Sequence, residues 1–301
     1  MSLTIRQLRY FIAAAETGQV SHAAMELNIS QSAVTAGIQA LEAGLGVRLL
    51  ARNAAGVSVT PQGARFLSRA KAIIAAVEEA SRSPLGEEAQ ASGRLRVGLT
   101  YTVAGYFMAR HYAAFRRIYP GIALELSEQP RSAIETALLA GGLDIAVMLT
   151  SNLGNTTDLA SETLFRSRRR LWLPSDHRLL AAQEVSLRDV AQEPYVMLTV
   201  DEASRTAGRY WDQYGLVPKV VFSTSSVEAV RSMVAAGMGV TILSDMVYRP
   251  WSLEGQRIEQ RLTVETVPSM DVGLTWPNDR PLSAPAQVFR AFLSAALGST
   301  P

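Results

Sequence analysis

Apolar residues in the first sixty positions recur at the three- and four-residue spacing of a helix, with short breaks between the repeats. Residues 4–18 predict a first helix with a capping box at its start and a glycine at its end. Residues 21–42 then predict two short helices joined by a tight turn, which is the layout of a helix–turn–helix. We expect Ser21 to be the N-cap of the first of these two helices, and Asn28 to end it in the left-handed conformation.

The second helix of this pair has one apolar and one polar stripe. Ser30 is suited to cap it and Gly46 to end it. The apolar stripe that we expect to be buried consists of Val34, Ile38, Leu41 and Leu45. Short polar side chains, which can reach base edges in a major groove, form the opposite stripe: Gln31, Ser32, Thr35 and Gln39. We predict that this polar stripe contacts DNA bases; for Ser32 a plain first-turn position is the alternative.

Residues 47–59 predict a small two-stranded element. Residues 47–50 and 56–59 have strand-like patterns, and residues 53–55 (Asn-Ala-Ala) form the tip between them. Two short strands after a helix–turn–helix are typical of a wing, so the N-terminal sixty residues predict a winged helix–turn–helix.

A long amphipathic helix is predicted next, from Thr60 as N-cap and Pro61 as first helical residue to about residue 81. Its apolar positions follow a three–four repeat over about two heptads: Leu67, Ala70, Ile74, Val77 and Ser81. This seam predicts a dimerising linker helix; the alternative is an amphipathic helix packed on its own domain. Breaks at residues 83–86 and 91–93 predict a hinge after it.

From residue 94 onward, strands and helices alternate, which predicts α/β layers with mostly parallel sheets. The predicted strands are residues 95–99, 122–126, 144–149, 171–173, 195–198, 240–243, 263–267 and 272–276. The predicted helices are residues 102–119, 132–140, 203–214, 226–236 and 286–297.

Composition narrows the function classes. The 301 residues carry a net charge of +2, but residues 1–71 hold seven basic and three acidic side chains, as a nucleic-acid-binding module would, unless surface arginines are scattered there by chance. The chain has no cysteine, which excludes disulfides and thiolate sites. No apolar run reaches the ~20 residues of a membrane span, and the N-terminus does not read as a signal peptide, so we expect a cytoplasmic protein. His22, His111 and His177 are too dispersed to predict a metal site.

The order winged helix–turn–helix, long helix, hinge and α/β region resembles the LysR-type transcriptional regulators. The N-terminal motifs that carry the resemblance are LRYF at residues 8–11, residues 21–42, LGVRLLAR at residues 45–52 and VTPQG at residues 59–63. Further matches are GLDIAV at residues 142–147, PSDHRL at residues 174–179 and VAAGMGV at residues 234–240. Together the motifs span the whole chain.

The resemblance implies an α/β protein with an N-terminal winged helix–turn–helix, a long linker helix and a two-lobed effector domain like periplasmic binding proteins of type II. The implied domains are a DNA-binding domain (residues 1–60), a dimerising linker helix and hinge (61–93) and an effector-binding domain (94–301). Lobe I would comprise residues 94–164 and 269–301, and lobe II residues 165–268. The two crossovers are expected near residues 164–167 and 264–268, with a small molecule bound between the lobes.

The recognition helix departs from the family pattern. Regulators of this family usually carry a basic residue in the middle of that helix, where this chain has Thr35-Ala36-Gly37. Gly37 costs the helix about 1 kcal/mol against alanine. Phosphate contacts must then depend on Arg48 and Arg52, unless Arg52 forms a surface ion pair with Glu42.

Six side chains are candidates for the effector site. They follow strands of the two lobes and comprise Thr100, Thr102, Arg131, Thr199, Thr224 and Ser225. Hydroxyls and N–H groups at a helix start suit an anionic ligand, and Arg131 can bind a carboxylate in a bidentate way. The alternatives are N-capping by Thr102 and a solvated Arg131. The ligand expected is a small molecule, an organic acid being one candidate, with no cofactor or metal.

The sequence predicts no enzyme. An S-x-x-K pattern at residues 68–71 lies within the linker helix without a K-T-G partner, and residues 237–239 lack the third glycine of a dinucleotide loop. The expected partners are double-stranded promoter DNA, a small-molecule effector and a second copy in a dimer or tetramer, with RNA polymerase as a further candidate. A solute-binding protein with an unrelated N-terminal extension is the alternative function.

Overall fold

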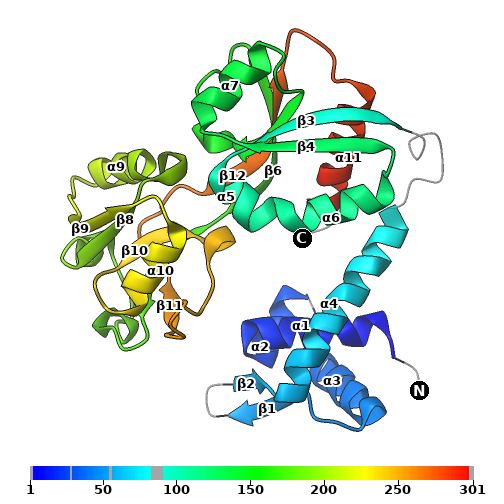
Figure 1. The fold of residues 1–301 in the computed structure, drawn as a ribbon. Coiled ribbons are helices and arrows are strands. Elements are labelled where there is room, and N and C mark those ends of the chain that lie inside the picture. Colours follow the sequence, from blue (N-terminus) through cyan, green and yellow to red (C-terminus); the bar gives the residue numbers. More distant parts are fainter. Residues whose placement is uncertain (1–2, 28, 54–55, 83–90, 298–301) are drawn as a thin grey trace. The chain divides into compact units, whose positions relative to one another are not determined.

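The computed structural model describes residues 3–27, 29–53, 56–82 and 91–297. The chain divides into two compact units, Met1–Pro84 and Leu85–Pro301 (Figure 1). The predicted hinge, Asn28 and the tip residues Ala54 and Ala55 lie outside the described residues. The predicted domain and lobe boundaries stay predictions.

The first unit consists of helices around a small core, with a two-stranded wing. Its elements are α1 (Ile5–Thr17), α2 (Val20–Glu26), α3 (Gln31–Leu45), β1 (Leu50–Asn53), β2 (Gly56–Val59) and α4 (Pro61–Arg82). The capping box at Thr4 and Gln7 is present, and Gly18 ends α1 with a φ of 70°. Thr60 caps α4 through a 2.9 Å bond from the N–H of Gly63. The predicted winged helix–turn–helix is therefore confirmed in its main elements.

Two local predictions in this unit are wrong. Helix α2 begins at Val20, with Gln19 rather than Ser21 at the N-cap position. The reason is a tight turn, in which the Thr17 hydroxyl donates to the carbonyl of Gln19 at 2.9 Å and fixes the helix start two residues earlier. The first wing strand begins at Leu50, three residues later than predicted, because the N–H groups of Leu49 and Leu50 donate to the Glu42 side chain of α3.

The core of the first unit includes part of the long helix. Leu8 and Phe11 of α1 and Leu41 of α3 are buried in this core together with Ala70 of α4. In Figure 1, α4 runs past α1 and extends away from the other helices of this unit. The first half of α4 is therefore packed on its own domain, which was the alternative to a dimerising helix. Val77, further along the helix, is exposed.

The second unit is built on a five-stranded sheet in one lobe, and on a three-stranded and a two-stranded sheet in the other. Its helices are α5 (Tyr101–Val103), α6 (Ala109–Ile118), α7 (Arg131–Leu139), α8 (Leu187–Val190), α9 (Ala203–Gln213), α10 (Val227–Ala235) and α11 (Ala284–Leu297), with a π-helical turn, Ala104–Met108, joining α5 to α6. Its strands are β3 (Gly93–Leu99), β4 (Ile122–Glu128), β5 (Ile145–Leu149), β6 (Leu159–Ser167), β7 (Arg169–Pro174), β8 (Pro194–Leu198), β9 (Lys219–Thr224), β10 (Thr241–Ser244), β11 (Ile258–Arg261) and β12 (Met270–Pro277).

Five strands form the larger sheet, in the order β4-β3-β5-β12-β6 (Figure 1). β3 pairs in parallel with β4 and β5, and β12 pairs antiparallel with β5 and β6. α6 and α11 pack their aromatic residues, among them Phe115 and Phe289, on one face. α7 covers the other face through Ile134 and Leu138. The result is a three-layer lobe, in which α5 begins directly after the end of β3.

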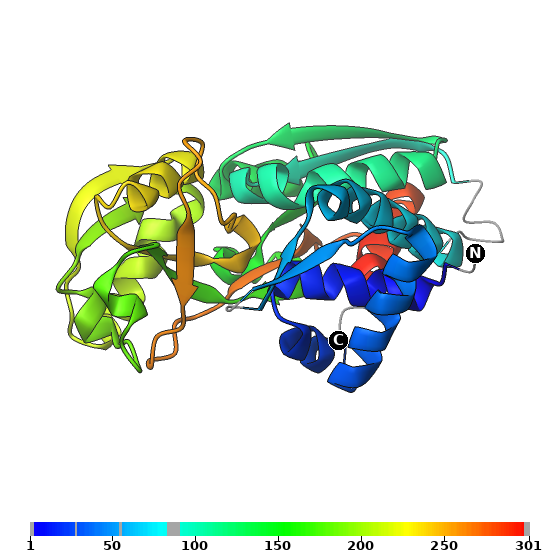
Figure 2. The same cartoon turned by 90° about the horizontal axis from the view of Figure 1, so that it is seen from below.

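The remaining strands form the second lobe. β7 lies between β10 and β11, and β8 pairs with β9 and is joined to the neighbouring strand by a bridge between Tyr195 and Val240. The chain passes from the larger sheet to this lobe between β6 and β7, and returns between β11 and β12 (Figure 2). The predicted strands at β3, β4, β5, β7, β8, β10 and β12 are confirmed, with shifts of at most two residues at their ends.

Two further predictions are wrong, and part of the strand pattern was missed. Residues 263–267 are not a strand. The N–H of Val264 donates to the carbonyl of Val185, and the Glu265 side chain accepts the N–H of Leu187, so this segment bonds to the loop before α8 and to the first residue of α8, and not to a neighbouring strand. Strands β9 and β11 were not predicted, and β6 was expected only at its end, as the crossover near residues 164–167. The helix expected from residue 102 begins at Tyr101, so Thr102 lies inside its first turn and is not the N-cap.

Candidate functional site

Helix α3 presents the predicted polar stripe to solvent. The Ser30 hydroxyl accepts the N–H of Ala33 at 3.2 Å and caps the helix, and Gly46 ends it with a φ of 69°. The buried residues of α3 are Val34, Ile38 and Leu41. On the opposite face Gln31, Ser32 and Gln39 are exposed and Thr35 is half-buried. The Ser32 hydroxyl lies 3.0 Å from that of Ser30, so Ser32 also takes part in the first turn, as the alternative reading had it.

The glycine in the middle of α3 has a packing reason. A Cβ at Gly37 would lie 2.5 Å from Cδ2 of Tyr10, whose ring covers this point of the helix. The close approach of α1 to α3 therefore requires a residue without a side chain here.

A groove lies beside α3, with a cavity volume of about 610 Å³. It is lined by Thr35, Gln39 and Glu42 of α3, by Arg48, and by Val57 of the wing, among others. The structure thus brings two of the predicted base-reading residues together with one predicted phosphate-binding arginine. Gln31 and Ser32 lie on the first turn of α3, outside the lining of this groove.

Glu42 fixes the start of the wing. Its Oε1 accepts the N–H of Leu49 at 2.7 Å and the N–H of Leu50 at 3.0 Å. Arg48, which directly precedes these residues, is exposed. Arg52 lies in β1 with its backbone opposite Val57, and its side chain lies outside the described part of the chain.

In the second unit, Thr102 is bonded to a carboxylate of the protein itself. The backbone N–H of Thr102 donates to Asp201 Oδ2 at 2.8 Å, and its hydroxyl donates to the same oxygen. Thr102 is 3 % exposed. Asp201 follows β8 of the second lobe, so this contact joins the two lobes.

Arg131 is also paired within the chain. Its Nη1 lies 2.7 Å from Glu135 Oε1, and its Nε lies 3.0 Å from Glu202 Oε1. The hydrogen bond to Glu135 is the main reason why the pKa of Arg131 is raised above its ordinary value; burial opposes this, and the negative charges of Glu135 and Glu202 add to it. The alternative of a solvated arginine is therefore wrong, because the side chain is only 16 % exposed and bonded on two sides.

A pocket of about 200 Å³ lies beside these contacts. It is lined by Tyr101, Glu128, Gln129, Pro130, Arg131, Val200, Asp201 and Glu202. Thr100, adjacent to Tyr101, is 1 % exposed, and its hydroxyl oxygen has no hydrogen-bond partner among the described residues. The pocket thus combines one aromatic ring with both acidic and basic groups at the junction of the lobes.

The three predicted effector-site residues of the second lobe, Thr199, Thr224 and Ser225, lie outside this pocket. The N–H of Thr199 donates to the carbonyl of Thr224 at 2.9 Å, and the Thr224 hydroxyl accepts the N–H of Ser226 at 3.1 Å. Ser225 is exposed, and Ser226 rather than Ser225 caps α10. None of these three predicted residues is among those that line the pocket.

Sequence reasoning missed the residues that connect the lobes. Asp201 and Glu202 lie directly after the predicted strand at residues 195–198. This position after a strand is the sequence signal that could have identified them as site residues. Tyr106 is a second connection, since its hydroxyl donates to Glu228 Oε1 of α10 at 2.7 Å. Burial is the main reason why the pKa of Tyr106 is raised to about 12, and the hydrogen bond to Glu228 adds to it.

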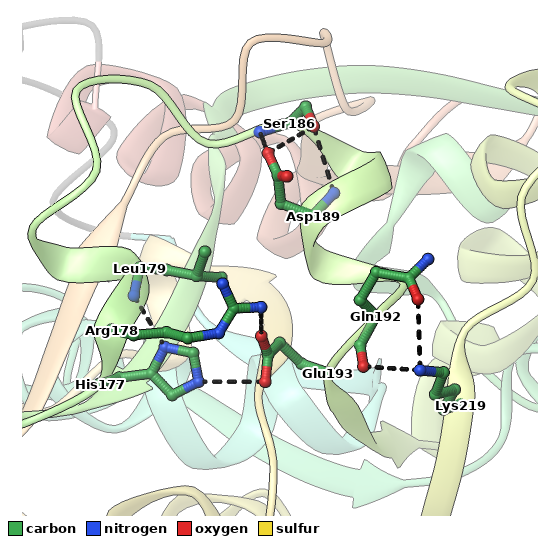
Figure 3. Close-up of polar contacts among 8 residues, drawn as sticks. All are labelled: His177, Arg178, Leu179, Ser186, Asp189, Gln192, Glu193 and Lys219. Atoms are coloured by element: carbon green, nitrogen blue, oxygen red, sulfur yellow. Dashed lines mark hydrogen bonds and ion pairs between the residues drawn. The ribbon is translucent and has the colours of Figure 1, made fainter.

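The loop after β7 has a structural role (Figure 3). His177 Nδ1 accepts the N–H of Leu179 at 3.2 Å, and Nε2 lies 3.5 Å from Glu193 Oε2. Arg178 pairs with the same carboxylate. Figure 3 shows the Glu193 carboxylate facing both His177 and Arg178. This supports a structural reading of the motif at residues 174–179. Within the described chain there is no group of three or more acidic or histidine side chains suited to a metal ion.

Comparison with protein families gives two matches that cover most of the chain. The model described as "Bacterial regulatory helix-turn-helix protein, lysR family" matches residues 5–64. The model described as "LysR substrate binding domain" matches residues 88–298. The chain belongs to the LysR family of transcriptional regulators.

Full-length LysR-type relatives are similar to this chain. The HTH-type transcriptional regulator TdfR of Cupriavidus pinatubonensis is 32 % identical, covering 98 % of both chains. The "Uncharacterized HTH-type transcriptional regulator YnfL" of Escherichia coli is 30 % identical, covering 99 % of this chain and 100 % of that protein. The solved structure of HinK, a LysR family transcriptional regulator from Pseudomonas aeruginosa, is 28 % identical with a TM-score of 0.63, covering 98 % of this chain and 99 % of that one.

These matches confirm the predicted fold class and function. The chain is a LysR-type DNA-binding transcriptional regulator with a winged helix–turn–helix and a two-lobed substrate-binding domain. The alternative of a solute-binding protein with an unrelated extension is not favoured, because the N-terminal region matches the family's own DNA-binding domain. Among the described helices, none is long and apolar enough to span a membrane.

Proposed function

We propose that this LysR-family regulator binds a palindromic promoter site as a dimer, through the polar face of α3. In this proposal Gln31, Ser32, Thr35 and Gln39 contact base edges, and Arg48 and Arg52 contact backbone phosphates. The observation that carries it is the groove lined by Thr35, Gln39 and Arg48 together. Such a groove combines neutral donors and acceptors for bases with one cation for phosphate.

The proposal extends to assembly and location. Two copies would be joined through α4, whose Ile73 and Val77 remain exposed after the first half of the helix has packed on its own unit. A tetramer, a contact with RNA polymerase at the promoter, a cytoplasmic location and the lack of a catalytic activity belong to the same proposal. The weakly charged recognition helix supports dependence on a second copy, because few phosphate contacts per subunit give modest affinity.

A fluorescence anisotropy titration of the full chain against its own upstream DNA tests the DNA interface. The expected affinity falls as salt rises, and Arg48→Ala weakens binding to every sequence while reducing the salt slope by about 1. Gln31→Ala is expected to weaken only the cognate site, by about 1–3 kcal/mol. Arg188→Ala, an exposed arginine of the second unit, is the matched control. Salt-independent binding, or an Arg48 variant that behaves like the Arg188 variant, would overturn the proposed interface.

For the second unit we propose a small organic acid as the effector, with Thr100, Thr102 and Arg131 from one lobe and Thr199, Thr224 and Ser225 from the other as its binding residues. The donors gathered at Thr102 and Arg131 support this class of ligand, since both bind carboxylates here. Bound effector would shift the population of conformations and so alter promoter contacts. A thermal-shift screen of organic acids tests the site: a hit that binds equally well after Thr100→Val and Arg131→Ala lies elsewhere.

A further inference from the structure

Two adjacent residues at the junction of the lobes have an unusual backbone. Asp201 has φ and ψ of 52° and 39°, and Glu202 has 58° and 24°. Within the described chain they are the only residues other than glycine with a positive φ. Side chains with a Cβ rarely adopt this left-handed region, because the Cβ approaches the following carbonyl oxygen. The Asp201–Glu202 segment must therefore be held by contacts outside itself.

Those contacts come from the lobe of the larger sheet. Asp201 receives the N–H and the hydroxyl of Thr102 on its carboxylate, and the side-chain amide of Asn152 donates to its carbonyl at 2.8 Å. Glu202 receives Nε of Arg131 at 3.0 Å. Both carboxylates of the segment are thus bonded to the opposite lobe.

The donors in these contacts are those that a carboxylate ligand would need. An N–H and a hydroxyl converge on one oxygen at Thr102, and Arg131 presents a guanidinium nearby. Charge-assisted bonds of this kind are the stronger ones in proteins. With Asp201 in place, a ligand carboxylate and the Asp201 carboxylate compete for the same donors.

We propose that Asp201 is a built-in occupant of the effector site, and that a small carboxylate ligand binds by displacing it from Thr102. The inference rests on the proposed function of the cleft as an organic-acid site. Displacement removes one of the contacts that hold the Asp201–Glu202 segment in its left-handed conformation, so the segment is less constrained and one connection between the lobes is exchanged for a ligand. The ligand's apparent affinity is lowered by the fraction of molecules in which Asp201 occupies the site.

The competing reading is that Asp201 is a purely structural side chain that bonds the first turn of α5. In that case its removal leaves a defect that no small anion repairs specifically. The two readings differ in what happens when the carboxymethyl group of Asp201 is cut away and offered back in solution. Acetate has the size and charge of that group, so it is the probe of choice.

The experiment uses the full chain with Asp201→Gly, since glycine tolerates the left-handed backbone. Thermal melts are recorded in sodium acetate and in sodium chloride of equal ionic strength. We expect the variant to melt below the wild type in chloride and to regain its melting temperature in acetate in a saturable way. The wild type should gain nothing from acetate beyond chloride. Asp201→Gly combined with Thr102→Val should lose the acetate effect.

A second variant keeps the test decisive if Asp201→Gly does not fold. Asp201→Asn retains an acceptor and tolerates the left-handed region but loses the negative charge. Isothermal titration with acetate is expected to give about tenfold tighter binding to Asp201→Asn than to the wild type. Equal responses of wild type and variants to acetate, or no response in either variant, would overturn the proposal.

The same variants separate this inference from the proposed function. DNA anisotropy of Asp201→Gly reports on α3 independently of acetate. Acetate rescue without DNA binding would contradict the proposed DNA interface and leave the role of Asp201 intact. DNA binding without acetate rescue would contradict the role of Asp201 alone.

Discussion

The ring of Tyr10 lies against Gly37 in the middle of helix α3, so close that a Cβ at Gly37 would come within 2.5 Å of Tyr10 Cδ2. The contact joins α1, which forms much of the core of the first unit, to the helix that we propose reads DNA. A glycine that lowers helix propensity is thus required by the packing of its neighbour.

Gly37→Ala is expected to destabilise α3 although alanine is the better helix former by about 1 kcal/mol. The new methyl group forces the Tyr10 ring aside, and such overpacking costs about 1–3 kcal/mol. Hydrogen exchange of α3 peptides measures the change: exchange should be faster than in the wild type.

Gly44→Ala is the matched control, since it lies in the same helix and a Cβ there would meet nothing within 4 Å. It is expected to leave α3 as stable as the wild type or slightly more so. Combining Gly37→Ala with Tyr10→Ala should slow the exchange relative to Tyr10→Ala alone. If Gly37→Ala and Gly44→Ala behave alike, the Tyr10 contact does not explain the glycine.

Glu42→Ala is expected to loosen the start of the wing. The variant leaves the N–H groups of Leu49 and Leu50 without their acceptor, at a cost of about 1–3 kcal/mol. Amide exchange at Leu49 and Leu50 should accelerate, and DNA affinity should fall because Arg48 directly precedes them. Glu42→Gln keeps an acceptor oxygen and should be milder; faster exchange in the glutamine than in the alanine variant would contradict the assigned bonds.

The first unit could be predicted from the sequence because its signals are local. The capping box at Thr4, the N-cap at Ser30 and the glycines that end α1 and α3 each depend on residues within one turn of each other. The error at Ser21 has a similarly local cause, in a Thr17 turn that competes with the expected cap. The reason for Gly37 could not be predicted, since it depends on a ring from another helix.

Of the side chains that bond the two lobes together through Asp201 and Glu202, the sequence predicted only residues of the lobe with the five-stranded sheet. Thr102 and Arg131 follow predicted strands, and the structure places both in contact with carboxylates. Their partners Asp201 and Glu202 lie about seventy to a hundred residues away in sequence, and pairing over such distances leaves no periodic signal. The polar strand β11 was missed because Ile258 is its only buried residue, and the other three are partly buried at the edge of a sheet, which weakens the alternation.

Arg131→Ala is expected to destabilise the second unit by about 1–3 kcal/mol, because it leaves the partly buried carboxylates of Glu135 and Glu202 without their shared cation. Chemical denaturation followed by tryptophan fluorescence is a suitable measurement, since all four tryptophans lie in this unit. Arg131→Lys retains a charge but not two-sided bonding, and should fall between alanine and wild type. A loss no larger than that of the exposed control Arg188→Ala would contradict the role of this arginine.

The contact of Tyr106 with Glu228 predicts a pH dependence. Burial is the largest single effect on the pKa of Glu228, and it raises that pKa. Hydrogen bonds from Arg231 and Tyr106, together with the charge of Arg231, outweigh the effect of burial. The pKa of Glu228 therefore lies below its ordinary value of 4.5. The unfolded chain then takes up a proton first as the pH falls. The stabilisation is therefore complete above pH 4.5 and is lost as the pH falls from there through the folded pKa.

Glu228→Gln removes this dependence while keeping the shape of the side chain. The wild type is expected to be more stable than the variant at neutral pH, and the difference should shrink once the pH falls below 4.5. Tryptophan fluorescence during denaturation at several pH values measures it, since Arg231 stacks over Trp172 at 5.9 Å. Glu184→Gln, on an exposed side chain, is the control and should follow the wild type. A difference between wild type and Glu228→Gln that grows as the pH falls would refute the assigned direction of the shift.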